Sequence, residues 1–169
     1  MEKFTFPPFG KIDLSSLDDN YTAEIDVNGV TVGVDLYFDF IDTSEHQAYA
    51  MKCFIDQISR IDIQNRIYID KEYDNVEGEI VKEYLNYHFD ELDKEDLYEL
   101  VDFGNTAIDP EKQLYSKLKL CGVGLHSKPS DRLGFNSFFE YTVCGEISDC
   151  VIVVATDGFG KPDHLYWES

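Results

Sequence analysis

The feature that most constrains the fold is an alternating segment over residues 21–40, interrupted by Asn28-Gly29. Asn-Gly readily adopts the positive φ angles of a two-residue type I′ turn, so the segment predicts a β-hairpin. Side chains alternate along a strand, so one face of this hairpin is apolar and the other polar. The expected register consists of three facing apolar pairs: Val27 with Val30, Ile25 with Val32 and Ala23 with Val34.

The C-terminal third predicts further strands separated by turn-rich stretches. Their expected bounds are Leu118 to Leu125, Phe138 to Cys144, Cys150 to Ala155 and His164 to Glu168. The third of these strands is a continuous apolar run, which suits a central strand buried on both faces. Gly122 and Gly124 share one face of the first strand, and glycines inside a strand mark a bulge or a close backbone approach. We call these C-terminal strands the meander. The sequence leaves open whether the N-terminal hairpin and this meander form one sheet or two.

The middle of the chain is predicted to be helical. Thr43 or Ser44 can cap a first helix whose apolar stripe runs from Tyr49 to Ile61. Three further helices are expected over Ile63 to Tyr73, from near Asn75 to Leu92, and over Lys94 to Val101. We therefore expect one α+β domain over residues 1–169. Its mostly antiparallel sheet would combine the N-terminal hairpin and the C-terminal meander, with three to four helices packed on one side.

The chain has 34 Asp and Glu against 14 Lys and Arg, a net charge of −20. Such a charge repels phosphate backbones and anionic lipid surfaces, so it disfavours nucleic-acid and membrane binding. It favours a basic protein partner, because opposite fields speed encounter. The opening MEKFTFPPFG lacks the pattern of a signal peptide, and no apolar run approaches the roughly 20 residues that span a bilayer. We therefore expect a cytoplasmic protein.

Acidic residues are concentrated in the helical middle. Residues 70–102 hold 13 Asp and Glu against 3 Lys, whereas residues 110–137 have a net charge of +3. An acidic stretch most often forms only the solvated face of a helix. The alternative is a docking surface for a basic partner. The candidate residues of that surface are Asp90, Glu91, Asp93, Glu95, Asp96, Glu99 and Asp102.

Motifs that would indicate catalysis are missing from the sequence. It has no glycine-rich nucleotide motif, HExxH, EF-hand loop or GxSxG. The four cysteines lack CxxC spacing and are expected to be buried thiols, and His88 falls on an apolar helical stripe, where a core role is expected. Asp39, Asp42 and Glu45 can bind a cation, although a strand end and a helix start are the expected roles. We expect no catalytic residue, no metal site and no cofactor.

Several segments together form a pattern known from one protein family. They are a Leu-rich strand with Gly-Val-Gly at Leu118 to Leu125, Phe-x-Tyr-Thr at Phe139 to Thr142, an apolar run at Val151 to Val154, Asp157-Gly158 and a terminal Glu168-Ser169. The opening FGKIDL precedes a hairpin that contains Val-Asn-Gly. This pattern resembles the DUF2004 family of small bacterial α/β proteins. The resemblance implies a similar fold and, because some members are candidate immunity proteins in toxin systems, a neutralising role. It implies no catalytic residues.

Three classes of function remain open. The first is a non-catalytic acidic binding protein, an immunity protein that neutralises a basic bacterial toxin. The second is a regulatory or structural protein. The third is a small-ligand module without catalysis, or an enzyme, with a pocket between sheet and helices, and the missing motifs disfavour the enzyme. Each is expected to be a monomer or a small homo-oligomer.

Overall fold

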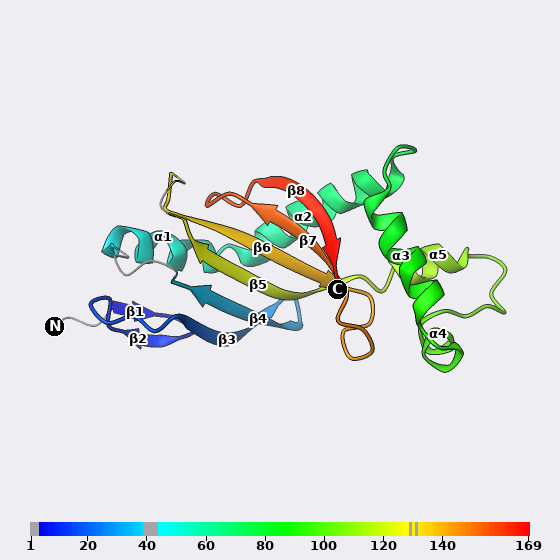
Figure 1. The fold of residues 1–169 in the computed structure, drawn as a ribbon, viewed down its shortest axis with the longest axis horizontal. Coiled ribbons are helices and arrows are strands. Elements are labelled where there is room, and N and C mark those ends of the chain that lie inside the picture. Colours follow the sequence, from blue (N-terminus) through cyan, green and yellow to red (C-terminus); the bar gives the residue numbers. More distant parts are fainter. Residues whose placement is uncertain (1–3, 39–43, 129, 131) are drawn as a thin grey trace.

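The computed structural model describes residues 4–38, 44–128, 130 and 132–169. Its central element is a 6-stranded sheet with the strand order β3-β4-β5-β6-β7-β8. These strands are Asn20–Val27 (β3), Val30–Tyr37 (β4), Lys119–Ser127 (β5), Phe135–Thr142 (β6), Val151–Thr156 (β7) and Pro162–Glu168 (β8). A separate two-stranded sheet pairs β1 (Phe4–Phe6) with β2 (Gly10–Ile12), near the left end of the large sheet in Figure 1.

The predicted hairpin is confirmed as the pair β3–β4. Asn28 has φ 55° and Gly29 has φ 84°, the positive angles that a type I′ turn requires. Val32 and Val34 are fully buried on the apolar face. The three predicted facing pairs are all present: Val27 with Val30, Ile25 with Val32 and Ala23 with Val34.

Hairpin and meander form one sheet. β4 pairs in parallel with β5, and this pairing places Val34 beside Val123 and Leu36 beside Leu125. All other neighbouring strands of the sheet are antiparallel. The expected α+β class with a mostly antiparallel sheet is therefore confirmed, and a single parallel pair joins its two halves.

The helices are α1 (Glu45–Ile55), α2 (Ile58–Asp74), α3 (Ile80–Glu91), α4 (Lys94–Leu100) and α5 (Pro110–Tyr115). Figure 1 shows α2 running behind the sheet, whereas α3, α4 and α5 gather beyond the strand ends at the right. No helix in the described part of the chain is both long and apolar enough to cross a membrane.

Helix α5 was not expected, although its start has two sequence signals. Asp109 caps the helix by accepting a hydrogen bond from the N–H of Glu111, and Pro110 occupies the first helical position, where its missing N–H costs nothing. The helix has only 6 residues, which is too short to show the repeated apolar spacing that predicts a helix.

The apolar stripe from Tyr49 to Ile61, which predicted one helix, belongs to two helices. Helix α1 ends at Ile55 and α2 begins at Ile58. Phe54, Ile58 and Ile61 are all buried, so the apolar spacing continues across the break and does not reveal it. The expected cap at Ser44 is present: its side chain accepts from the N–H of Gln47 in a capping box.

Helix α3 begins at Ile80, and not near Asn75 as predicted. The Glu72 carboxylate of α2 accepts the N–H groups of Ile80 and Val81 at 2.8 and 3.0 Å, which caps the new helix from outside. A Cβ at Gly78 would lie 2.0 Å from the carbonyl oxygen of Glu72, so only glycine fits at this position. A contact between two helices therefore sets this boundary.

One face of the sheet supplies the core. Its fully buried side chains include Leu36, Leu125, Phe139 and Tyr141. Strand β7 is buried on both faces, as its apolar run predicts: Ile152, Val153, Val154 and Ala155 are all buried. The strand glycines predicted a bulge or a close backbone approach, and the register between β5 and β6 does shift between Leu120 and Gly122.

His88 lies in the core, as expected, but its buried Nε2 has no hydrogen-bond partner among the described residues. Its side chain is fully buried in α3, with Nδ1 2.8 Å from the carbonyl oxygen of Tyr84 and its ring against Tyr84 and Tyr87. Because Nδ1 donates to that carbonyl, the neutral ring fits this site. Burial lowers the pKa of His88 below its ordinary value of 6.5.

The two faces of β6 give a first prediction. Phe139 is fully buried on the core face, whereas its neighbour Phe138 lies on the other face and is only half-buried. We expect Phe139→Ala to lower the free energy of unfolding by about 3–5 kcal/mol and Phe138→Ala by clearly less, as measured by chemical denaturation. Equal losses would show that both faces are packed equally.

His88 gives a second prediction. In the unfolded chain it binds a proton near pH 6.5, whereas the folded protein resists protonation, so stability that is complete above pH 6.5 is lost as the pH falls below it. Denaturation at pH 7 and pH 5 should show this loss in the wild type and in the exposed-site control His164→Asn. The loss should be smaller in His88→Leu. The same loss in all three proteins would contradict the assignment.

Candidate functional site

The seven acidic residues predicted as a docking surface lie at the C-terminal end of α3, in α4 and just after it, at the right of Figure 1. Six are exposed and Asp96 is half-buried. None of the seven forms an ion pair with another described residue. Two also have local roles: Asp93 caps α4, and Asp102 accepts the N–H of Gly104.

Beside these carboxylates lies an exposed aromatic pair that the sequence analysis did not single out. Tyr98 of α4 is 65% exposed and Phe103 is 43% exposed, and their rings meet edge to face at 5.2 Å. Large apolar side chains in solvent within a polar rim are typical of protein interaction sites. We call Tyr98, Phe103 and the seven acidic residues the α4 surface.

The Gln113 side chain contributes three hydrogen bonds to the loop that follows the α4 surface. The Gln113 amide oxygen accepts the N–H of Asp102, and its nitrogen donates to the carbonyl oxygens of Asp102 and Ile108. These three bonds fix Phe103 in a preformed position next to Tyr98. A preformed surface loses less conformational entropy on binding than a mobile one.

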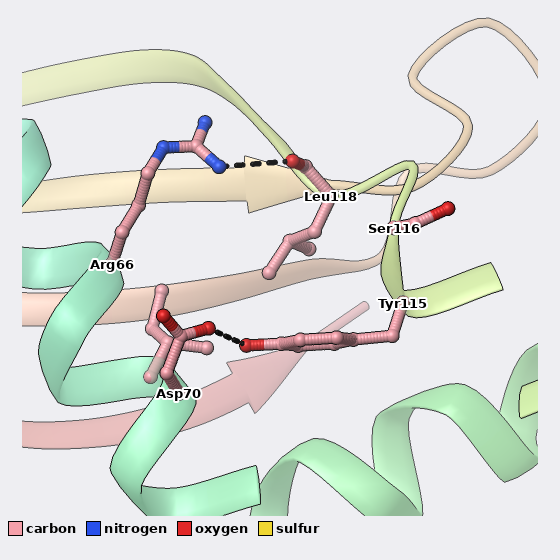
Figure 2. A pocket seen from close by; sticks show the side chains of 6 residues that line it. Arg66, Asp70, Tyr115, Ser116 and Leu118 are labelled. Atoms are coloured by element: carbon pink, nitrogen blue, oxygen red, sulfur yellow. Dashed lines mark hydrogen bonds between the residues drawn. The ribbon is translucent and has the colours of Figure 1, made fainter. Parts of the chain in front are cut away.

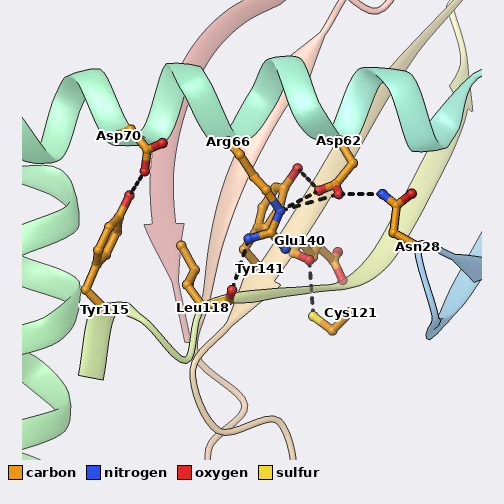
Figure 3. Close-up of polar contacts among 9 residues, drawn as sticks. All are labelled: Asn28, Asp62, Arg66, Asp70, Tyr115, Leu118, Cys121, Glu140 and Tyr141. Atoms are coloured by element: carbon orange, nitrogen blue, oxygen red, sulfur yellow. Dashed lines mark hydrogen bonds and ion pairs between the residues drawn. The ribbon is translucent and has the colours of Figure 1, made fainter. Parts of the chain in front are cut away.

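A polar network anchors α2 to the sheet (Figure 3). The buried Asp62 carboxylate accepts from the hydroxyl of Tyr141 at 3.0 Å, from Nε of Arg66 at 3.2 Å and from the Asn28 amide at 3.5 Å. Arg66 also donates to the carbonyl oxygen of Leu118 at 3.1 Å. The sequence shows Asp62 and Arg66 one helical turn apart, but their sheet partners are distant in sequence. This network was therefore missed.

A pocket of about 190 Å³ opens next to this network, between α2 and the connection from α5 to β5 (Figure 2). It is lined by Arg66, Ile69, Asp70, Tyr115, Ser116 and Leu118. The Tyr115 hydroxyl donates to Asp70 at 2.5 Å, and the Tyr115 ring stacks on Tyr73 at 4.1 Å. Both tyrosine rings are thereby held in fixed orientations.

The tyrosines of this region are hydrogen-bond donors at neutral pH. Burial, followed by the hydrogen bond to Glu111, raises the pKa of Tyr73 to about 12. Burial and Asp70 raise the pKa of Tyr115, and burial and Asp62 raise that of Tyr141. These hydroxyls stay protonated, so they suit binding and positioning better than proton transfer.

The cysteines are free thiols. Cys144 and Cys150 are buried as expected, whereas Cys53 and Cys121 are half-buried. Burial raises the pKa of Cys121 and of Cys144 to about 11, so these two sulfurs are poor nucleophiles at neutral pH.

The cation site weighed from the sequence falls mostly outside the residues that the structure describes. Asp39 and Asp42 lie outside the described residues, and Glu45 begins α1. Within the described ranges, no group of three or more His, Cys, Asp or Glu side chains is arranged to hold a metal ion.

In comparisons with known proteins, the chain matches no family model, no curated protein and no solved structure. The resemblance to DUF2004 therefore stays an expectation.

The network around Asp62 gives a third prediction. Tyr141→Phe removes one donor from a buried carboxylate at nearly constant volume, so the free energy of unfolding should fall by about 1–3 kcal/mol. Tyr166→Phe, on a half-buried residue of β8, is the matched control and should change stability by less than about 0.5 kcal/mol. Chemical denaturation measures both. A neutral effect of Tyr141→Phe would show that Arg66 and Asn28 satisfy Asp62 alone.

Proposed function

We propose that this protein is a non-catalytic binding protein that engages a basic protein through its α4 surface. The observation that carries the proposal is the exposed Tyr98–Phe103 pair, which lies among carboxylates that have no ion-pair partner among the described residues. An acidic stretch without apolar anchors would be explained by solvation alone. The aromatic pair adds the hot spot that a solvated helix face does not need.

Charge and aromatic contact have different roles in this proposal. The acidic residues attract a basic partner and raise the rate of association, an effect that salt screens over about 8–10 Å at ordinary ionic strength. Burial of Tyr98 and Phe103 slows dissociation, because large rings exclude water at the centre of an interface. The complex should therefore form more slowly at high salt and dissociate faster when the two rings are truncated.

The class of partner follows from the resemblance described above. We propose a basic bacterial toxin, neutralised by a cytoplasmic immunity protein. The α4 surface supports the basic character of that partner, and the resemblance supports its role as a toxin.

One observation favours a second candidate, a small-ligand module without catalysis. The pocket beside Tyr115 holds about 190 Å³, and a cavity of about 150 Å³ is enough for a molecule the size of benzene. Its fixed tyrosine ring and the Asp70 carboxylate are suitable contacts for such a ligand.

The fourth prediction tests the α4 surface with its charge unchanged. A basic protein is captured from the source cell at low salt. The double variant Tyr98→Ser, Phe103→Ser should hold about one tenth or less of the amount that the wild type holds, because truncation of each interface aromatic costs about 1–2 kcal/mol or more of binding free energy. Bound proteins are identified and quantified by mass spectrometry, and capture is repeated at high salt.

The matched control replaces two other exposed apolar residues that lie in neither the α4 surface nor another predicted contact, as Tyr49→Ser, Ile63→Ser. Wild type and control should retain the same basic protein at low salt and lose it at high salt. Equal retention by the Tyr98/Phe103 variant would remove the α4 surface as the binding site. Retention of no basic protein by the wild type would count against the proposed function.

A further inference from the structure

A second exposed surface has the opposite charge. It is a groove of about 450 Å³ between the outer face of α2 and the β7–β8 connection. We call it the basic groove, lined by Arg60, Gln64, Ile67, Tyr68, Lys71, Phe159, Lys161 and Pro162. Three of these residues are cations and none is acidic, in a chain whose acidic residues outnumber its basic ones by 34 to 14. This distribution is the reverse of the chain's overall composition.

The groove has an apolar centre with cations around it. Arg60, Gln64, Ile67 and Lys71 follow a helical spacing that places them on one face of α2, opposite its buried face. Ile67 is 50% exposed and Phe159 is 53% exposed, although both are large and apolar. This combination is typical of a surface that binds an apolar group with an acidic rim.

Local contacts position two groups of this region without neutralising them. The Arg60 guanidinium donates to the neutral amide of Gln57 at 2.5 Å. The Asp157 carboxylate accepts the backbone N–H groups of Phe159 and Lys161, which fixes the turn that carries both side chains. The Arg132 guanidinium lies 5.6 Å from the centre of the Phe159 ring and adds a further cation at the edge.

The same chain also presents the complement of this groove. The α4 surface has an exposed aromatic pair within an acidic rim, whereas the basic groove has Ile67 and Phe159 within a basic rim. In Figure 1 the β7–β8 connection and α4 lie toward opposite ends of the molecule, so one copy cannot bring its own two surfaces together. Two copies can.

We propose that copies of this chain associate head to tail, with the α4 surface of one copy in the basic groove of the next. The two patches differ, so the contact is heterologous and leaves one free surface at each end of the assembly. The overall negative charge opposes association at long range. Salt near 0.15 M screens that repulsion beyond about 8 Å, whereas groups in contact still attract.

This association would regulate the α4 surface. A copy whose α4 surface is seated in a groove cannot present Tyr98 and Phe103 to another protein. A basic partner would therefore compete with self-association, and the competition would depend on the concentration of the protein. The inference shares this surface with the proposed function but does not require that a basic partner exists.

The fifth prediction uses two variants that each remove one surface without reversing its charge. The groove variant is Arg60→Ala, Phe159→Ala, Lys161→Ala, and the surface variant is Tyr98→Ala, Glu99→Ala, Phe103→Ala. The wild type should show a mass in sedimentation velocity that rises with concentration above the 19.5 kDa of one chain. Each variant alone should remain a single chain at the same concentrations.

An equal mixture of the two variants is the decisive sample. Only one functional pairing remains, the intact α4 surface of the groove variant with the intact groove of the surface variant. The mixture should therefore form pairs of two chains and nothing larger. All substituted residues are exposed, and unchanged circular dichroism and Tm confirm that the variants fold.

Three outcomes would overturn the inference: a wild type that stays a single chain, a variant that still associates alone, or a mixture that does not pair. These outcomes are separable from a failure of the proposed function. The groove variant keeps the α4 surface intact, so it should bind a basic partner whether or not the wild type self-associates.

Discussion

The parallel pairing of β4 with β5 is the constraint on which the rest of the structure depends. All neighbouring strands of the large sheet are consecutive in sequence, and every pair except β4 and β5 is antiparallel. Parallel strands cannot be joined by a tight turn and require a crossover connection. The five helices of the described residues all lie in the crossover between Tyr37 and Lys119. The α4 surface, the pocket and the helical wall of the basic groove are all parts of it.

Asp62 anchors helix α2 of this crossover to the sheet. Its carboxylate is reached by donors from the hairpin turn, from α2 and from β6, while Arg66 extends the contact to the chain just before β5 (Figure 3). A buried carboxylate is stable only when such donors surround it. The network therefore fixes the rotation of α2, so that Ile61 faces the core and Ile67 faces solvent.

Local patterns predicted the local structure well. The hairpin register follows from Asn28-Gly29 and alternation, and α4 was expected within one residue of its observed end. The boundaries between helices were harder to predict than the elements themselves. Glu72 sets the start of α3, and the apolar spacing hides the break before Ile58. For the candidate site, charge identified the carboxylates, but exposure of an aromatic ring depends on which neighbours the fold supplies, so Tyr98 and Phe103 were missed.

The long crossover also has a consequence for how the chain can change over generations. The entropy of closing a loop grows only with the logarithm of its length, and each doubling costs about 0.6 kcal/mol. The connection between α4 and α5 lies beyond the strand ends, so insertions there would barely alter the closure of β4 onto β5. The sheet can thus stay constant over generations while the connection at its helical end changes in length and sequence.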